Sequence, residues 1–156
     1  MGNIVIHTDG GVQNNGKRDC YGACAYVILK DELHLNENVE CLFNTTNNRA
    51  EMQAILNSLH YLKDNRLHTH TVTLYSDSQY CIKGCNNWIH SWVKKKFMKN
   101  GAYIPNADLW REMYQLIINF DNLTFKWVKG HDGNEMNDYI NDLCTAKQEQ
   151  MKNNLV

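Results

Sequence analysis

The stretch Ile4-Val5-Ile6-His7-Thr8-Asp9-Gly10-Gly11 joins a run of β-branched residues to an aspartate and two glycines. Such residues favour strands, so the stretch predicts a buried strand that ends at Asp9. The glycines would let the backbone turn close to whatever the Asp9 carboxylate holds. The run Val72-Thr73-Leu74-Tyr75-Ser76-Asp77 has the same form. If the two strands are parallel neighbours, their carboxylates meet at the carboxyl end of the sheet, where sites in open α/β sheets lie.

A third carboxylate, Glu51, lies near the start of a predicted helix, after Thr45-Thr46-Asn47-Asn48-Arg49-Ala50. Asn48 could cap this helix with Glu51 at the third position of a capping box. The apolar stripe of the helix nevertheless directs Glu51 towards the sheet. Carboxylates from distant segments repel one another unless cations lie between them, and Mg²⁺ prefers oxygen ligands. An aspartate before glycine is also common in turns, so only the set of three predicts a magnesium site.

The rest of the chain predicts an α/β fold with a mixed five-stranded sheet flanked by helices. Strand-like runs cover residues 4–8, 21–29, 39–43, 71–76 and 123–128. Helical patterns cover residues 48–63, 79–98 with an interruption near 84–87, 107–119, and a last segment from near Asn134. The first three strands follow one another closely, as antiparallel strands do, and the last two are expected to be parallel.

Length and composition indicate an ordinary globular protein. A chain of 156 residues fits one domain, residues 1–156, and 43% hydrophobic residues can supply its core. No apolar run is long enough to cross a bilayer and the N-terminus has no signal peptide, so we expect no membrane contact and a cytoplasmic location. Six cysteines without a Cys-x-x-Cys pair are expected to be free thiols.

Charge is distributed unevenly along the chain. The formal net charge of −1 argues against a broadly basic nucleic-acid binder. Residues 78–107, however, contain no acidic residue, and they hold five lysines together with Trp88, Trp92, Phe97 and Tyr103. This segment predicts either a contact surface for phosphates or a solvated helix with tryptophans in the core. The residues alone leave both interpretations open.

Six short motifs occur in an order and spacing that resemble the type 1 ribonuclease H family over essentially the whole chain. They are Thr8-Asp9-Gly10-Gly11, Thr46-Asn47-Asn48-Arg49-Ala50-Glu51, Ser76-Asp77-Ser78-Gln79-Tyr80, Trp88-Ile89-His90-Ser91-Trp92, Asn106-Ala107-Asp108-Leu109-Trp110 and Trp127-Val128-Lys129-Gly130-His131. The resemblance implies a ribonuclease H-like fold, and endonucleolytic hydrolysis of the RNA strand of RNA–DNA hybrids to 5′-phosphate and 3′-hydroxyl ends. It also implies two Mg²⁺ ions per site, roughly 4 Å apart and replaceable by Mn²⁺, in a monomeric protein.

The resemblance also implies roles for individual residues. Asp9 would bridge both ions, Asp77 would support the same site, and Glu51 would hold the ion nearer the leaving group. His131, on a predicted glycine-flanked loop, would transfer protons or assist product release. The basic handle, residues 83–103, would press against the nucleic acid. The expected substrate-binding residues are Asn15, Thr46, Asn47, Asn48, Gln79, Trp88, Trp92, Lys94, Lys95, Lys96 and Lys99.

One position departs from the family pattern. The fourth carboxylate of the family is an aspartate four residues after the asparagine matched by Asn137, and here that position is Asn141. A carboxamide offers one acceptor oxygen and no charge, so we expect the ion that activates water to bind more weakly. Activity would then be lowered or shifted towards Mn²⁺. Asp138 on the same helical face could compensate, whereas Asp142 is turned away by about 100°.

Two other functions stay open on the sequence. The chain could be a weakly active or inactive module that binds hybrids, because Asn141 replaces the fourth aspartate. It could also be a domain of a reverse transcriptase or a relative that cleaves other substrates.

Overall fold

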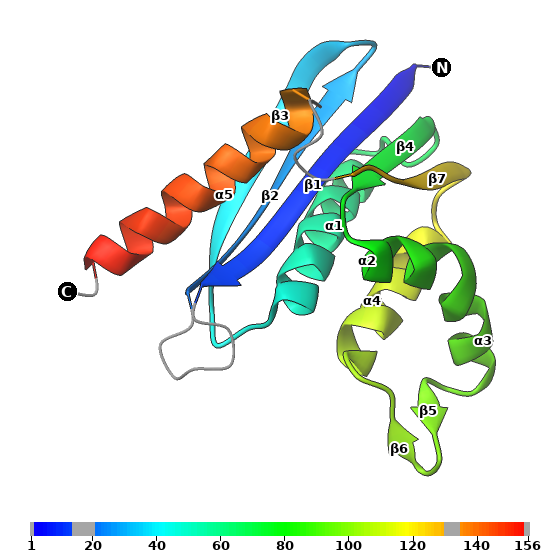
Figure 1. Cartoon of the computed structure of the whole chain (residues 1–156). Helices are drawn as coiled ribbons and strands as arrows, with labels where there is room; N and C mark the ends of the chain where they lie inside the picture. The colour runs from blue at the N-terminus through cyan, green and yellow to red at the C-terminus, as the bar shows by residue number, and fades with distance from the viewer. Residues whose placement is uncertain (1, 14–20, 130–134, 155–156) are drawn as a thin grey trace.

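A five-stranded mixed sheet forms the centre of the computed structural model, which describes residues 2–13, 21–129 and 135–154 (Figure 1). The strand order is β3-β2-β1-β4-β7, with antiparallel pairing from β3 to β1 and parallel pairing from β1 to β7. The predicted mixed sheet is therefore confirmed. Its strands are β1 (Asn3–Gln13), β2 (Tyr21–Lys30), β3 (Leu33–Phe43), β4 (Thr71–Ser76) and β7 (Asn122–Trp127).

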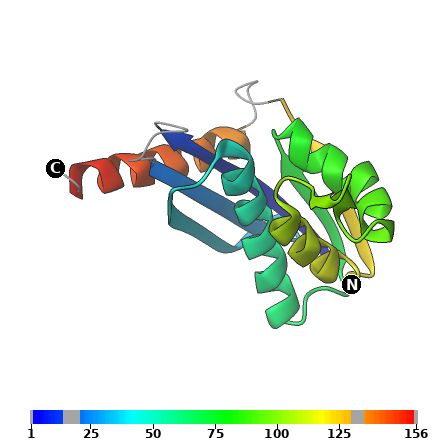
Figure 2. The same cartoon turned by 90° about the horizontal axis from the view of Figure 1, so that it is seen from below.

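Helices cover the two faces of the sheet (Figure 2). One face packs against α1 (Asn47–Asp64), which is contacted in turn by α4 (Ala107–Ile117), and the other face packs against α5 (Glu135–Asn154). Side chains of a strand alternate between faces, and β2 shows the result: Tyr26 and Ile28 join the core under α1, whereas Ala25 and Val27 contact α5. Within the described residues, no helix is both long and apolar enough to cross a bilayer, and the five cysteines are free thiols as expected.

Strand β1 is longer than predicted. Asp9 does not end it, because pairing with β2 continues from Asp9–Ala25 to Gln13–Tyr21, while pairing with β4 stops at His7–Tyr75. Gly10 is therefore not a turn residue. It lets the start of α1 approach the strand, since a Cβ at this position would lie 2.7 Å from the backbone nitrogen of Glu51. Strand β3 is also longer, starting at Leu33 instead of residue 39.

The predicted break of the helix near residues 84–87 is wrong, because these residues form a π-helical turn. The chain stays helical from α2 (Gln79–Lys83) through a π-helical turn, η1 (Gly84–Trp88), into α3 (Ile89–Lys94). Gly84 is required by packing, because a Cβ there would lie 2.6 Å from Cζ2 of the Trp110 ring. The handle ends in a small hairpin, β5 (Met98–Lys99) and β6 (Ala102–Tyr103), whose two-residue strands are too short to give a pattern.

Replacing Gly84 with alanine separates helix propensity from packing. Propensity alone predicts a gain of up to about 1 kcal/mol, because alanine is the better helix former. We expect the opposite, a loss of roughly 1–3 kcal/mol, because the new methyl group overlaps the buried Trp110 ring. Urea unfolding of the parent and of Gly84→Ala measures the difference, and a stabilised variant would contradict the packing assignment.

Candidate active site

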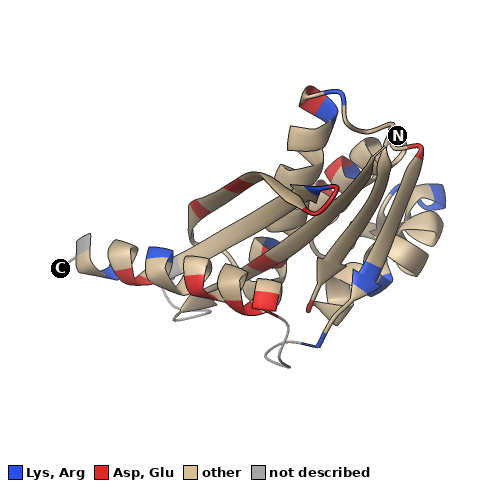
Figure 3. Cartoon of the chain, turned by 90° about the horizontal axis from the view of Figure 1, so that it is seen from above, with Lys and Arg blue, Asp and Glu red and all other residues tan. Residues whose placement is uncertain are grey.

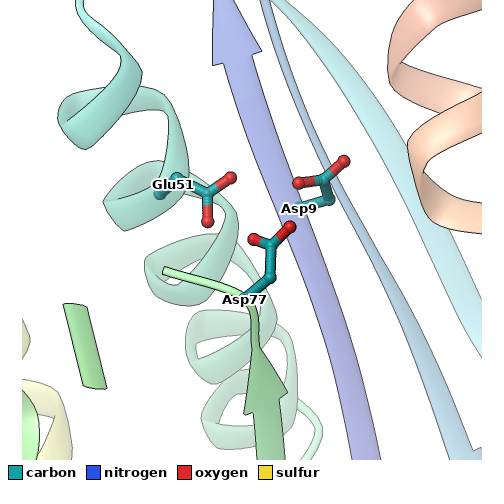
Figure 4. Close-up of side chains that lie close together, drawn as sticks. All are labelled: Asp9, Glu51 and Asp77. Atoms are coloured by element: carbon teal, nitrogen blue, oxygen red, sulfur yellow. The ribbon is translucent and has the colours of Figure 1, made fainter. Parts of the chain in front are cut away.

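Three carboxylates converge where β1 passes the carboxyl end of β4 (Figure 4). One carboxylate oxygen each from Asp9, Glu51 and Asp77 lies within 4.8 Å of the other two. Asp9 and Asp77 each follow the last parallel pair, His7–Tyr75, by two residues, so their side chains leave adjacent strands at the same level. The predicted meeting of these three carboxylates is confirmed, whereas their role as metal ligands stays a prediction.

Glu51 enters the site from helix α1 and is only 7% exposed. Its Oε1 accepts a hydrogen bond from the backbone N–H of Gly10 at 2.6 Å, and its Oε2 accepts one from the hydroxyl of Ser76 at 3.3 Å. The predicted capping box is wrong, because Thr46 caps the helix by accepting from the Arg49 N–H at 3.2 Å. Glu51 therefore lies beyond the capping positions, and its carboxylate is available to the site.

The three carboxylates are close enough to shift the pKa of Glu51. Burial raises the pKa of Glu51 well above its usual value, and the charges of Asp9 and Asp77 and a hydrogen bond with Asp9 raise it further. The hydrogen bond from Gly10 acts in the opposite direction but does not offset these effects. A cation between the carboxylates would relieve the repulsion. Because all three donors are carboxylate oxygens, a hard cation such as Mg²⁺ or Mn²⁺ fits this set better than a metal that prefers nitrogen or sulfur.

Helix α5 carries Asn141 along the face of the sheet to which Asp9 points. Asp9 pairs directly with Ala25, whose side chain contacts α5, so both side chains lie on that face. The thiol of Cys144 lies 3.7 Å from the backbone oxygen of Asp9. Asn141 is half-buried one turn before Cys144, on the same side of the helix. Asn141 therefore lies on the side of α5 that faces the sheet beside Asp9, and its role as a fourth metal ligand stays a prediction.

Two side chains that the sequence did not single out hold the backbone around the acidic cluster. The indole N–H of Trp127 donates to the backbone oxygen of Asp77 at 3.0 Å. Ser76, the last residue of β4, is fully buried and donates to Glu51. Both residues occur in the motifs, but a strand-end serine and a tryptophan of a distant strand carry no signal of these contacts before the chain is folded.

A polar brace, formed by Arg49, Asp108, Asn106, Tyr80 and Trp110, joins the start of α1 to the base of the handle. Arg49 binds Asp108 through two hydrogen bonds, at 3.0 and 2.8 Å, and these bonds lower the pKa of Asp108 to about 2. Asn106, in a left-handed conformation with φ of 60°, accepts from Arg49 and donates to the Tyr80 hydroxyl. The Trp110 indole donates to the same hydroxyl at 3.0 Å. Sequence reasoning missed this brace because its hydrogen-bonded partners are up to 59 residues apart.

Four of the predicted substrate-binding residues lie on the surface at the elements that supply Glu51 and Asp77. Thr46, Asn47 and Asn48 are exposed at the start of α1, and the Asn47 side chain also accepts from the Val12 N–H at 3.0 Å. Gln79 is exposed at the first position of α2, two residues after Asp77. These residues border the site through the elements that supply Glu51 and Asp77.

The handle places its basic and aromatic residues differently. Trp88 is 40% exposed. The lysines predicted to contact the substrate are all exposed: Lys94, Lys95, Lys96 and Lys99. Trp92 is half-buried, and the centroid of its ring lies 5.0 Å from that of Trp110, so Trp92 packs the handle against α4. The interpretation as a solvated helix with a tryptophan against the core holds in part, since the lysines are in solvent and Trp92 packs on Trp110. Phosphate contact stays a prediction. Two further predicted site residues, Asn15 and His131, lie outside the described residues.

Comparison with known sequences gives one consistent family. The family model described as RNase H matches residues 1–149. A relative named ribonuclease HI from Rickettsia prowazekii (strain Madrid E) is 36% identical over 151 residues, which cover 94% of this chain and 91% of the relative. A ribonuclease HI from Haemophilus ducreyi is 36% identical over 145 residues, covering 92% of this chain and 86% of the relative.

Solved structures show the same fold. LC9-RNase H1, described as a type 1 RNase H with the type 2 active-site motif, superposes with a TM-score of 0.81 at 20% identity, covering 96% of this chain and 74% of that protein. LC11-RNase H1, solved in complex with an RNA/DNA hybrid, gives a TM-score of 0.72 at 19% identity, covering 95% and 98%. At these identities the likeness concerns the fold alone.

The raised pKa of Glu51 predicts a stability effect with a defined sign. The folded protein binds a proton at Glu51 more tightly than the unfolded chain does, so it loses stability as the pH rises from the unfolded pKa to the folded one. Without divalent cations, Glu51→Gln should therefore melt higher than the parent at pH 7.5, by at least about 3 °C. The difference should vanish below about pH 3, where Glu51 is protonated in both states.

Asp108→Asn serves as the control of opposite sign. The lowered pKa of Asp108 contributes stability above its unfolded pKa, and this stability is lost as the pH falls towards 2. At pH 7.5 this variant should melt slightly lower than the parent, since the ion pair is partly exposed. Thermal unfolding in EDTA across this pH range checks both signs, and a Glu51→Gln variant less stable at pH 7.5 would contradict the electrostatic account.

Proposed function

The chain belongs to the RNase H family, and on that basis we propose that it hydrolyses the RNA strand of RNA–DNA hybrids as an endonuclease, leaving 5′-phosphate and 3′-hydroxyl ends. The observation that carries the proposal is the convergence of Asp9, Glu51 and Asp77, with oxygens within 4.8 Å of one another. Family membership makes the protein a ribonuclease H, and this cluster supplies the negative charge that a metal-dependent hydrolase requires.

The proposed cofactor is a pair of Mg²⁺ ions, with Mn²⁺ able to substitute. Asp9, Glu51 and Asp77 would hold these ions, with Asn141 adding a neutral oxygen from α5. When bound, divalent cations supply activation of the attacking water and stabilisation of the departing 3′-oxygen. His131, which follows β7 in the chain, is proposed to move protons or to assist the departure of the product.

The hybrid is proposed to lie across the start of α1 and the start of α2. Thr46, Asn47, Asn48 and Gln79 present hydroxyl and amide groups there, on the surfaces next to Glu51 and Asp77. Such groups can both donate to and accept from a ribose 2′-hydroxyl, which distinguishes RNA from DNA. Asn15 completes the proposed set. Because these groups would contact the sugar-phosphate backbone, cleavage should show little sequence preference.

The handle is proposed to bind the phosphate backbone of the hybrid. Its lysines project into solvent, and Figure 3 shows the handle and the acid-rich helix α5 at opposite ends of the molecule. With a formal net charge of −1, the protein must draw its attraction for nucleic acid from this local excess. Trp88 would add an exposed ring, and Trp92 would hold the handle against α4. A monomer that acts in the cytoplasm is the accompanying expectation.

The proposed function is tested with a labelled RNA–DNA hybrid, double-stranded RNA and double-stranded DNA, each in Mg²⁺ and in Mn²⁺. We expect cleavage of the RNA strand of the hybrid alone. Asp9→Asn should lower the single-turnover rate on the order of 1000-fold, because about 4 kcal/mol of transition-state stabilisation depends on the cations. Tight binding of the hybrid without any cleavage in either metal would contradict the enzymatic assignment.

Restoring the missing charge tests the role of Asn141. Asn141→Asp should lower the Mg²⁺ concentration for half-maximal cleavage by about tenfold, an effect of roughly 1.4 kcal/mol, and should reduce any preference for Mn²⁺. Asn122→Asp is the matched control, since it adds the same charge at the start of β7, away from the carboxyl ends of the parallel strands. An unchanged metal dependence in Asn141→Asp would defeat the assignment of Asn141 as a ligand.

A further inference from the structure

Neither the end of β4 nor the start of α2 requires a serine at position 76. It is the last residue of β4, and it is 0% exposed. Its hydroxyl lies between the backbone N–H of Ser78, at 3.0 Å, and the Oε2 of Glu51, at 3.3 Å. A hydroxyl has one hydrogen to donate. The Ser76 hydroxyl accepts from the Ser78 N–H and donates this hydrogen to Glu51.

We propose that Ser76 is a positioning residue that orients the Glu51 carboxylate for cation binding. The inference rests on the proposed function, since it concerns the same metal site. The opposite oxygen of Glu51 is held by the Gly10 N–H at 2.6 Å. Glu51 is thus held from β1 by Gly10 and from β4 by Ser76, the residues that immediately follow Asp9 and precede Asp77.

This arrangement matters because Glu51 approaches on a long, rotatable side chain. Burial and the two neighbouring carboxylates both favour rotation of an ionised Glu51 away from the cluster. Hydrogen bonds to both of its oxygens oppose that rotation before any cation arrives. Partners that orient a ligating side chain typically change metal affinity by about 10–100-fold when they are removed. Ser76 should therefore affect metal affinity more than it affects folding.

A purely structural role for Ser76 makes a different prediction. The Ser76 hydroxyl also anchors the backbone of Ser78, and the Ser78 hydroxyl caps α2 by accepting from the Cys81 N–H at 3.1 Å. If loss of the Ser76 hydroxyl acted by loosening α2, removal of the α2 cap would reproduce it. Ser78→Ala removes the cap and keeps both bonds of the Ser76 hydroxyl, so it separates the two roles.

The experiment is a calorimetric titration of Mn²⁺ into the full chain without nucleic acid, with circular dichroism to verify folding. Ser76→Ala should raise the Kd for Mn²⁺ roughly tenfold. Ser76→Thr should stay within about threefold of the parent, because threonine keeps the hydroxyl and suits a strand. Ser58→Ala is the matched control: it deletes another fully buried hydroxyl of the same core, bonded to the Ile55 backbone oxygen, and should leave the Kd unchanged. Ser78→Ala should leave it unchanged as well.

The outcomes separate this inference from the function on which it rests. If the parent does not bind Mn²⁺, or if Asp9→Asn binds it equally well, the proposed metal site fails. If the parent binds and Ser76→Ala binds equally tightly, or if Ser78→Ala shows the same loss, the positioning role is overturned. Should Ser76→Ala not fold, Ser76→Cys takes its place, because a thiol is similar in size but a weak donor and should also raise the Kd.

Discussion

Mutual repulsion among three buried or half-buried carboxylates is the constraint on which the rest of this structure depends. Asp9, Glu51 and Asp77 are held within 4.8 Å of one another by elements that are far apart in the chain. Isolated side chains would separate or take up protons, as the raised pKa of Glu51 shows. The fold must therefore hold them in place at the expense of stability, which is common at functional sites.

Close backbone contacts make that possible. Gly10 lets α1 approach β1 until its N–H reaches Glu51, and Gly84 lets the π-helical turn rest on the Trp110 ring. The brace from Arg49 through Asp108 and Asn106 then links the start of α1 to the handle. These contacts connect the helix that supplies Glu51 with both surfaces proposed to bind the hybrid.

An asparagine at position 141, where the resemblance to the family would place a fourth aspartate, fits the same electrostatic constraint. A fourth carboxylate on α5 would add to a site in which Glu51 already has a raised pKa. An amide lowers that repulsion while it keeps one oxygen that can ligate a cation. Compared with an aspartate at this position, the asparagine should lower the affinity for the cation and raise the stability of the cation-free protein, because one like charge is removed from the site.

The sequence by itself determined the sheet, because β-branched runs and helical periodicity reflect local preferences and burial. It also identified Asp9, Glu51 and Asp77, because each acidic residue lies where a strand or a helix start fixes its place. Only the tertiary structure decided that β1 continues through Asp9 to Gln13, since this extension is stabilised by β2 and not by its own residues. The bond from Ser76 to Glu51 and the brace on Arg49 likewise depend on partners 25 and 59 residues away. Local sequence carries no record of such contacts, because they exist only after distant elements pack together.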